Sequence, residues 1–246
     1  MEHLNKVIPK IAKFHALSYV LKAQKPNYIR DLKKYLEPLD SRMELVSSLL
    51  EHGMNVIRND EKLCKYFPRI KIVMEDGLKK GYWRSSLPLQ DPYTCIIHGD
   101  LWTNNILFHK HNNCCIDDVK FIDFQTYFLS SPFRELLFLL CTSSEITVIN
   151  NHFDDCLEKY LTGLTSVLEK YDYCDTNIFS ESHVQYRLKY DSVEVLLYIM
   201  WVIKLFTLRE GESIPNDIES PIYTANEIYI SRLREIIFLY VRKNWI

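Results

Sequence analysis

Glycine is scarce in this sequence, and the net charge is close to zero. Only 6 of the 246 residues are glycine, whereas 13% are aromatic and 47% are hydrophobic. A chain with few glycines and many leucine, isoleucine and tyrosine residues predicts mostly helix, with few tight turns. The formal net charge of −2 gives no general attraction to nucleic acid or to anionic membranes, so neither is expected as a partner.

The sequence also lacks a secretion signal, a membrane span and a cysteine framework. Its first residues, MEHLNKVIPKIAKFHAL, contain no apolar core of a signal peptide. The most apolar run, 195–203, lies between Glu194 and Lys204 and is too short to span a bilayer. The seven cysteines are odd in number and form no Cys-x-x-Cys pair. Reduced thiols in a cytoplasmic protein are therefore expected, without metal binding by cysteine.

Three short apolar runs in the middle of the chain predict three strands. They cover Ile96–Ile97, Ile106–Phe108 and Val119–Ile122. A polar stretch, residues 110–118, separates the last two runs and predicts the turn of a hairpin. Asp117 lies in this stretch and is expected to be a solvated turn residue, as is Asp118.

Polar side chains stand where these predicted strands end. Asp100 comes soon after the first strand, Asn105 precedes the second, and Asp123 follows the third. Mg²⁺ prefers hard oxygen ligands, usually one or two from the protein, and the Asp123 carboxylate and the Asn105 amide oxygen fit that preference. Asp100 then remains to accept the proton of an attacking hydroxyl and to hold it in line. This set of residues predicts metal-assisted phosphoryl transfer.

The same residues carry a resemblance to the protein-kinase-like enzymes. The run 98–105, HGDLWTNN, resembles their catalytic loop, and the run 123–125, DFQ, resembles their Asp-Phe-Gly motif. Gly99, in place of the arginine of protein kinases, points toward the small-molecule kinases. The strings HGDLWTNNILF, FIDFQ and SPFRELLFLL are similar to one branch, the ecdysteroid-kinase-like family, also called the CHK-kinase-like domain.

This resemblance implies the large C-terminal lobe of a protein-kinase-like fold, which is α+β and mostly helical, with a small catalytic β-hairpin. It implies ATP as co-substrate, Mg²⁺ held by Asn105 and Asp123, and Asp100 as the catalytic base. The acceptor would be the hydroxyl of a small hydrophobic molecule, an ecdysteroid or a sterol-like alcohol. One domain over residues 1–246 is expected, with its catalytic core in residues 93–141.

Five further residues are expected to support this site. His98 is expected to hold the loop backbone, although its type also suits a base or a metal ligand. Trp102 should either pack the loop or line the acceptor pocket. Phe124 should pack inward and anchor the metal aspartate, while Gln125 replaces the usual glycine and removes the hinge of protein-kinase switching. Glu135 stands where relatives often carry aspartate, so a brace for the catalytic loop is expected there.

Helical periodicity surrounds this core. An amphipathic helix is predicted over residues 4–21, and His15 lies on its apolar stripe. A histidine in such a place is expected to be a hydrogen-bonded core residue. Ser131 and Pro132 predict the start of a buried helix. Helices are predicted over residues 42–58, 69–80, 132–141, 150–171, 182–208 and 225–243.

The resemblance covers nearly the whole chain but only one half of such an enzyme. A complete relative has a small β-rich lobe before the helix that begins here near Leu4. That lobe supplies a loop over the phosphates, a strand lysine and a glutamate that orients the lysine. Here Lys6, Lys10 and Lys13 lie on a predicted helix rather than a strand. The large lobe alone is therefore expected, and a truncated form of a longer kinase is preferred to a naturally short chain.

Two other interpretations stay open. A non-catalytic module could keep the pocket and bind a hydrophobic alcohol or a partner without turnover. A metal-dependent phosphohydrolase using His98, Asp100 and Asp123 is the weaker alternative, because such sites usually need more histidine or carboxylate ligands.

Overall fold

The structure, a computed structural model, describes residues 1–35, 43–80, 86–111, 115–207 and 226–246. Helices predominate in these ranges, and short strands form two small antiparallel sheets. The predicted α+β class, mostly helical, is confirmed. Contacts divide the chain into two compact units, residues 1–38 with 85–188 (unit 1) and residues 39–84 with 189–246 (unit 2). A single domain over 1–246 stays a prediction.

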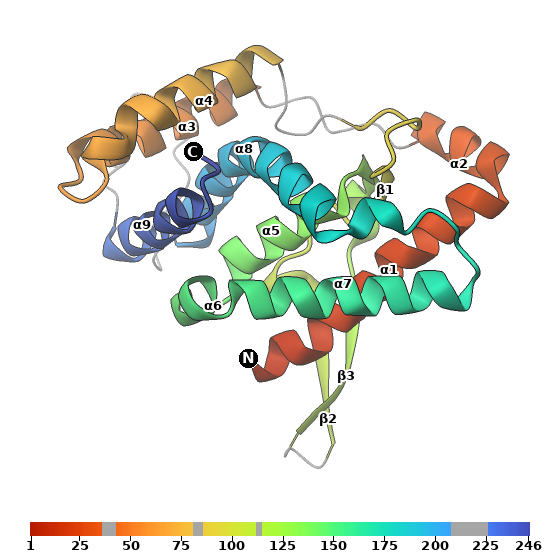
Figure 1. The fold of residues 1–246 in the computed structure, drawn as a ribbon. Coiled ribbons are helices and arrows are strands. Elements are labelled where there is room, and N and C mark those ends of the chain that lie inside the picture. Colours follow the sequence, from red (N-terminus) through yellow and green to blue (C-terminus); the bar gives the residue numbers. More distant parts are fainter. Residues whose placement is uncertain (36–42, 81–85, 112–114, 208–225) are drawn as a thin grey trace. The chain divides into compact units, whose positions relative to one another are not determined.

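Unit 1 contains both sheets and the candidate site. Its longer elements, shown in Figure 1, are α1 (Glu2–Gln24), α2 (Pro26–Leu32), β1 (Cys95–Ile97), β2 (Ile106–His111), β3 (Cys115–Phe121), β4 (Phe128–Ser130), α5 (Pro132–Ser143), α6 (Ile146–Asn151), α7 (Phe153–Lys170) and the start of α8 (Glu181–Phe206). Its 3-10 turns are η1 (Lys33–Tyr35), η4 (Thr103–Asn105), η5 (Phe124–Thr126) and η6 (Asn177–Phe179).

The predicted hairpin is confirmed, and its strands are longer than predicted. β2 and β3 pair antiparallel, with an irregularity in the register after His109. Much of the stretch 110–118, predicted as a turn, is therefore strand. Burial explains the extension, because the side chains of Ile116 and Val119 are both buried and anchor β3 along its length.

A further strand, β4, has no counterpart among the predicted strands. It pairs antiparallel with β1, with Cys95 opposite Ser130 and Ile97 opposite Phe128. All three of its residues are buried. Three residues are too few for a periodic pattern, which explains why the sequence does not reveal it. The pairing fixes the chain that leaves the candidate site against the strand that enters it.

The predicted amphipathic helix at the N-terminus is confirmed as α1, which packs against α7 (Figure 1). One face of α1 is buried throughout and includes Ile8, Ile11 and Ala12. The two helices approach closely at Gly163 of α7. A Cβ atom at that position would lie 3.2 Å from the Cβ of Ala12 and 3.7 Å from the Cα of Pro9. A small residue is therefore needed at this crossing.

The buried helix predicted after the candidate site is confirmed as α5. Ser131 is its N-cap, and the Ser131 hydroxyl accepts the Phe133 N–H at 3.3 Å. Every residue from Pro132 to Thr142 is buried, which explains a helix that is apolar nearly all round. Its first turn also carries Glu135, a position where the helix dipole favours a carboxylate.

The helix predicted over 150–171 is two helices, so this prediction was wrong in its detail. α6 ends at Asn151 and α7 begins at Phe153. The backbone of His152, with φ −129° and ψ 14°, leaves the helical region between them. Its ring lies 2.9 Å from the carboxylate of Asp155 in the first turn of α7, and acidic residues in a first turn favour a new helix start.

Unit 2 is a set of helices. It contains α3 (Met43–Asn59), η2 (Cys64–Tyr66), α4 (Phe67–Lys80), the rest of α8 and α9 (Glu227–Arg242). The α-helices match the predicted ones within two residues wherever the predicted ends lie in the described ranges, and the predicted ends at 42, 208 and 225 lie outside those ranges. Asn226 is the N-cap of α9, and its side chain accepts the Tyr229 N–H at 2.9 Å. None of the helices described in either unit combines the length and apolar character needed to cross a membrane.

An ion pair joins the end of α3 to α9. One oxygen of Asp60 lies 2.7 Å from the Arg234 guanidinium, and the other accepts the backbone N–H groups of Lys62 and Leu63. Burial alone would raise the pKa of Asp60, but these hydrogen bonds outweigh burial, so the pKa lies below its usual value. The carboxylate therefore stays ionised and holds the two helices together.

A hollow of about 560 Å³ opens beside this pair. Its walls come from the end of α3, the turn after it and α9: His52, Asn55, Val56, Asn59, Asp60, Glu61, Lys62, Ile230 and Arg234. Burial, with repulsion from Lys204, lowers the pKa of His52 to about 4. His52 is consequently neutral at pH 7.

The close approach of α1 and α7 predicts the effect of enlarging Gly163. Replacing Gly163 by Val should lower the free energy of unfolding by about 1–3 kcal/mol, because the added atoms overpack the crossing. Urea denaturation of the wild type and the variant measures this difference. Thr162→Val, at the exposed neighbouring position of the same helix, is the control and should change stability little. Equal stability of Gly163→Val and the wild type would contradict the close packing.

The lowered pKa of His52 predicts a dependence of stability on pH. Between pH 6.5 and about 4 the unfolded state binds a proton that the folded state does not, so stability falls as pH falls through this window. After allowance for partial exposure of the ring, the loss is about 1–2 kcal/mol. Denaturation curves at pH 7, 6, 5 and 4.5 measure it. His52→Gln should flatten the dependence, whereas His3→Gln, at an exposed position, should leave it unchanged.

Candidate active site

The candidate site begins where β1 ends and the chain turns at Gly99. The backbone of Gly99 has φ +81°, a conformation that favours glycine. A Cβ atom there would lie 2.2 Å from the carbonyl oxygen of Thr126 and 3.0 Å from the ring of Phe128. Glycine at this position therefore lets the loop before Asp100 lie directly against the segment around η5 and β4.

The carboxylate of Glu135 binds the backbone of this turn. Glu135 is 2% exposed, and its two oxygens accept the backbone N–H groups of His98 at 3.0 Å and Gly99 at 2.7 Å. Hydrogen bonds to a charged acceptor contribute about 1.5–3 kcal/mol each. Glu135 therefore contacts the loop at the place where a brace is expected, although its effect on catalysis stays a prediction.

His98 joins the loop to the end of β3. Its side chain is fully buried, and its Nε2 lies 2.7 Å from the carbonyl oxygen of Ile122. Because a carbonyl oxygen only accepts, Nε2 carries the proton, and Nδ1 is left to accept the N–H of Asp100 at 3.4 Å. Both ring nitrogens face backbone groups. This geometry favours the support role expected for His98 over a base or a metal ligand.

Asn105 is brought against Asp100. Asn105 lies at the end of η4 and is 7% exposed. Its Nδ2 donates to the backbone oxygen of Asp100 at 2.8 Å and lies 3.3 Å from the Asp100 carboxylate. With the amide nitrogen directed to Asp100, the amide oxygen is the atom left to face a cation. The backbone oxygen of Asn105 accepts the N–H of Ile122 at 3.0 Å, which extends the hairpin by one pair.

Asp123 follows Ile122 and therefore stands at the same end of the hairpin as Asn105. Its backbone is left-handed, with φ 63° and ψ 59°, a conformation that aspartate tolerates better than most residues. The side chain is exposed, and Gln125 Nε2 lies 3.3 Å from one of its oxygens. The hairpin thus brings the three sequence-predicted residues Asp100, Asn105 and Asp123 to one end.

Phe124 differs from its expected inward position. Its ring is 39% exposed, and its centroid lies 4.4 Å from that of the buried His98 ring and 5.7 Å from that of the Phe14 ring. Trp102 is partly buried at the start of η4, and its contact with an acceptor stays a prediction.

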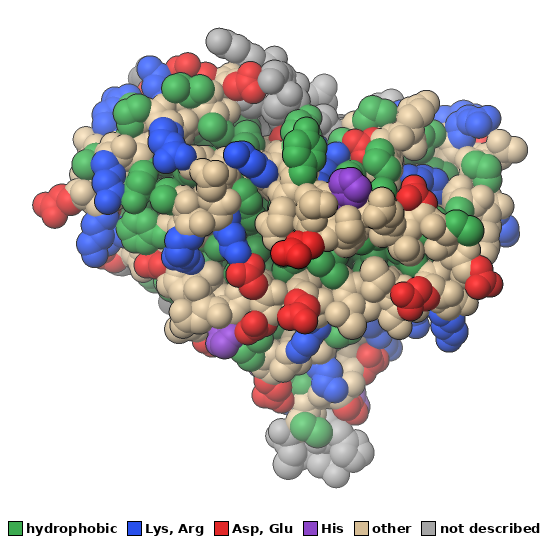
Figure 2. All heavy atoms as spheres, viewed as in Figure 1, with side chains coloured by type: hydrophobic (Ala, Val, Ile, Leu, Met, Phe, Trp, Pro, Cys, Tyr) green, Lys and Arg blue, Asp and Glu red, His purple; other side chains and the backbone are tan. Residues whose placement is uncertain are grey.

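The acidic residues expected in the hairpin turn lie apart from this site. Asp117 and Asp118 are exposed on β3, where their partners are His109 at 2.7 Å and Lys10 at 2.9 Å. Hydrogen bonds from these partners lower the pKa of both carboxyl groups. Figure 2 shows acidic and basic side chains intermixed where the hairpin projects. Both aspartates are thus solvated, as expected, but they belong to a strand.

Thr126 is a contact that the sequence did not reveal. Its hydroxyl lies 3.4 Å from the carbonyl oxygen of His98, and its own carbonyl oxygen closes the space beside Gly99. No local pattern identifies a threonine in this role, because the contact depends on the pairing of β4 with β1.

The donor set fits a magnesium ion. In the described part of the chain, no three histidine, cysteine or carboxylate side chains gather in a cluster that could hold a metal ion. Mg²⁺ does not need such a cluster, since it usually takes one or two protein oxygens and completes its octahedron with water and phosphate. Asn105 and Asp123 offer two hard oxygens next to Asp100. These residues, rather than the histidines, are the ones that could hold Mg²⁺.

The turn at Gly99 predicts a large effect of one methyl group. Gly99→Ala should lower the free energy of unfolding by about 2–4 kcal/mol, because it adds backbone strain to a clash with Thr126. Thermal and urea denaturation measure the change. Asn104→Ala, at an exposed position of the same loop, is the matched control. Wild-type stability of Gly99→Ala would show that the loop does not take this conformation.

Comparison with known proteins adds independent evidence on ancestry. The model of the Ecdysteroid kinase-like family matches residues 1–173, which include the loop, the hairpin and α5. Neither the curated proteins nor the solved structures gave a match. A match over 173 of the 246 residues covers well over half of the chain and indicates a kinase-like phosphotransferase. The chain belongs to the ecdysteroid kinase-like family.

Proposed function

We propose that this protein transfers the γ-phosphoryl group of ATP to the hydroxyl of a small hydrophobic molecule, with Mg²⁺ as cofactor. An ecdysteroid or related sterol-like alcohol is the proposed acceptor class. The observation that carries the proposal is the hydrogen bonding of Asn105 to Asp100, at the end of the hairpin where Asp123 also stands. The family match supports the same class of reaction.

The proposed base is Asp100. It follows a rigid turn, is only partly buried and can therefore meet an acceptor hydroxyl. As the hydroxyl oxygen forms its bond to phosphorus, the bond from phosphorus to the β,γ-bridging oxygen breaks and ADP leaves. The Asp100 carboxylate accepts the hydroxyl proton and keeps the nucleophile in line. Asn105 holds Asp100 in place through its amide nitrogen.

Asn105 and Asp123 are the proposed protein ligands of Mg²⁺. When bound, the ion would neutralise charge on the phosphate oxygens of ATP. Gln125 donates a hydrogen bond to one oxygen of the exposed Asp123 carboxylate. Asp123 would supply a carboxylate oxygen to the ion, and Asn105 would supply its amide oxygen.

The phosphohydrolase alternative finds less support. It would use His98 as a base or ligand, yet both ring nitrogens of His98 face backbone groups. The non-catalytic alternative has the same fold and the same residues, so nucleotide binding and turnover distinguish it. A cytoplasmic location is also proposed, because the odd number and the spacing of the seven cysteines favour reduced thiols.

Replacing Asp123 tests the proposed metal site. Asp123→Ala should weaken Mg²⁺-ATP binding and lower the rate of phosphoryl transfer by at least about a hundredfold, because a ligand that neutralises transition-state charge is lost. Calorimetric titration with Mg²⁺-ATP measures binding. Transfer from radiolabelled ATP to an ecdysteroid measures turnover.

Asp117→Ala is the matched control, since it removes an exposed carboxylate from the same hairpin at a position paired with His109. It should retain wild-type binding and turnover. Full activity in Asp123→Ala would contradict the assignment of Asp123. Nucleotide binding by the wild type without any product would favour the non-catalytic alternative.

A further inference from the structure

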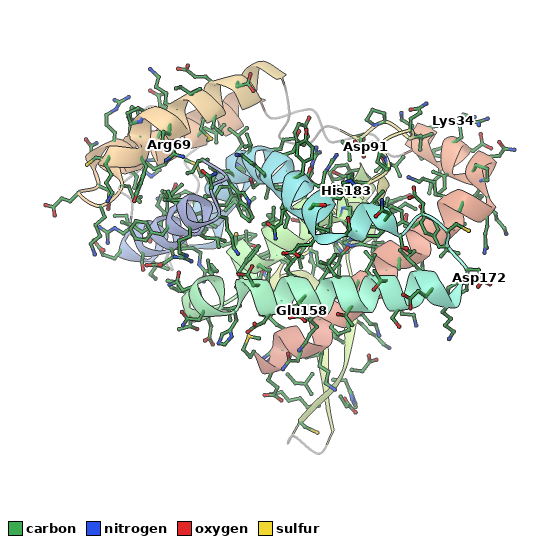
Figure 3. All side chains as sticks on the ribbon, in the orientation of Figure 1. Lys34, Arg69, Asp91, Glu158, Asp172 and His183 are labelled. Atoms are coloured by element: carbon green, nitrogen blue, oxygen red, sulfur yellow. The ribbon has the colours of Figure 1, made fainter. Side chains whose placement is uncertain are left out.

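The segment that leads into the candidate active site is bound along one polar stripe of α1. The stripe holds His15, Ser18, Tyr19 and Lys22, which lie on one helix face by their spacing. Ser18 Oγ accepts the Ile96 N–H at 2.6 Å, Tyr19 donates to the Tyr93 oxygen at 2.8 Å, and Lys22 donates to the Thr94 oxygen at 2.8 Å. These three contacts bind residues 93–96, the approach to β1 and its middle residue, to α1. Figure 3 labels Asp91, just before this segment.

His15, the first residue of this stripe, acts on the loop through Glu135. It is fully buried, and its Nε2 lies 2.9 Å from Glu135 Oε2. Its Nδ1 lies 2.9 Å from the hydroxyl of Tyr160 on α7. An ionised carboxylate only accepts hydrogen bonds, so Nε2 of His15 carries the proton that is donated to Glu135. Nδ1 lies within hydrogen-bond distance of the Tyr160 hydroxyl, which can donate to the ring or accept from it.

The Tyr160 hydroxyl stays protonated beside this ring. Burial, followed by the effects of Cys95 and Glu135, raises the pKa of Tyr160 well above its usual value. The uncharged phenol therefore holds the ring of His15 from its Nδ1 side. A buried chain of hydrogen bonds runs from Tyr160 through His15 to Glu135, and from Glu135 to the N–H groups of His98 and Gly99.

The two oxygens of Glu135 accept different numbers of hydrogen bonds. Within the described part of the chain, Oε1 accepts the Gly99 N–H alone, whereas Oε2 accepts both the His98 N–H and the His15 ring N–H. A buried carboxylate needs several donors, since an incompletely bonded charge in the interior is costly. Removal of the His15 donor would leave this carboxylate with two backbone donors and no side-chain donor. Its orientation, and with it that of the turn, would be less strongly defined.

We propose that His15 is a positioning residue, which, held by Tyr160, orients the Glu135 carboxylate and thereby the loop that carries Asp100. The positions of the His98 and Gly99 N–H groups depend on this chain directly. The catalytic part of this inference rests on the proposed function, because Asp100 must be the base for a displaced loop to slow phosphoryl transfer. The structural part concerns the loop alone and is independent of turnover.

Amide hydrogen exchange tests the structural part without any substrate. In the full-length protein, His15→Phe should speed exchange of the peptide containing residues 95–101 by at least about tenfold, because its two N–H groups lose a well-oriented acceptor. Tyr160→Phe removes one hydroxyl and should give a smaller increase in the same peptide. His15→Gln should stay near wild type, since its amide can still donate to Glu135. His3→Phe makes the same change at an exposed position of α1 and is the matched control.

Kinetics test the catalytic part. In variants with faster exchange, kcat should fall by about tenfold to a hundredfold, because small displacements of a positioned group are costly. KM for Mg²⁺-ATP should change less than kcat, since Glu135 contacts the His98 and Gly99 N–H groups directly and reaches Asn105 and Asp123 only through the loop. A variant that differed only in having a smaller folded fraction would show a lower apparent kcat, without exchange that is selectively faster in the peptide containing residues 95–101. Rescue of kcat by His15→Gln identifies the donor as the cause.

Each outcome decides the inference. Unchanged exchange in a folded His15→Phe, or in Tyr160→Phe if His15→Phe does not fold, overturns the positioning role. Faster exchange with unchanged kcat overturns its catalytic part. A wild type that shows no phosphoryl transfer at all would count against the proposed function, while the exchange data would still confirm or reject the orienting chain.

Discussion

The buried carboxylate of Glu135 is the interaction on which the rest of the candidate site depends. It binds the two N–H groups of His98 and Gly99 and so fixes the direction in which the chain leaves β1. A buried carboxylate is costly unless its oxygens are hydrogen-bonded, so its donors have to be well placed. Helix α5 provides the rigid support, with its capped start and its buried faces. The turn is consequently set by the core rather than by the surface.

From that turn the arrangement of the polar residues follows in two steps. His98 bonds to the carbonyl oxygen of Ile122, and Asn105 bonds to the N–H of the same residue, so loop and hairpin share one end. Asn105 bonds to Asp100, and Asp123 follows Ile122 at the same end of the hairpin. Two hard oxygen ligands and a base are part of what phosphoryl transfer needs from a protein, since much of the charge is neutralised by the metal. The proposed reaction rests on this geometry and on the family to which the chain belongs.

Local patterns in the sequence predicted most of the longer helices, the hairpin and the order of the polar residues, because periodicity, caps and spacing depend on a few neighbouring positions. The short helices α2 and α6 were not predicted. The sequence could not show β4 or Thr126, since both depend on pairing between distant segments. The full length of β2 and β3 and the helix break at His152 were not predicted either. Burial favours the longer strands, and the break goes with the contact between the His152 ring and Asp155. The 39% exposure of Phe124 was not predicted either, because an apolar side chain beside a predicted metal ligand suggests inward packing.

The central claim is that this chain transfers a phosphoryl group to a small alcohol. The most direct measurement is to incubate the purified protein with Mg²⁺, ATP and a panel of ecdysteroids and other sterol-like alcohols, and to follow the products by mass spectrometry. The account predicts a phosphate ester of an alcohol that forms only when Mg²⁺ and ATP are both present. No ester from any acceptor, together with no detectable binding of Mg²⁺-ATP, would contradict it.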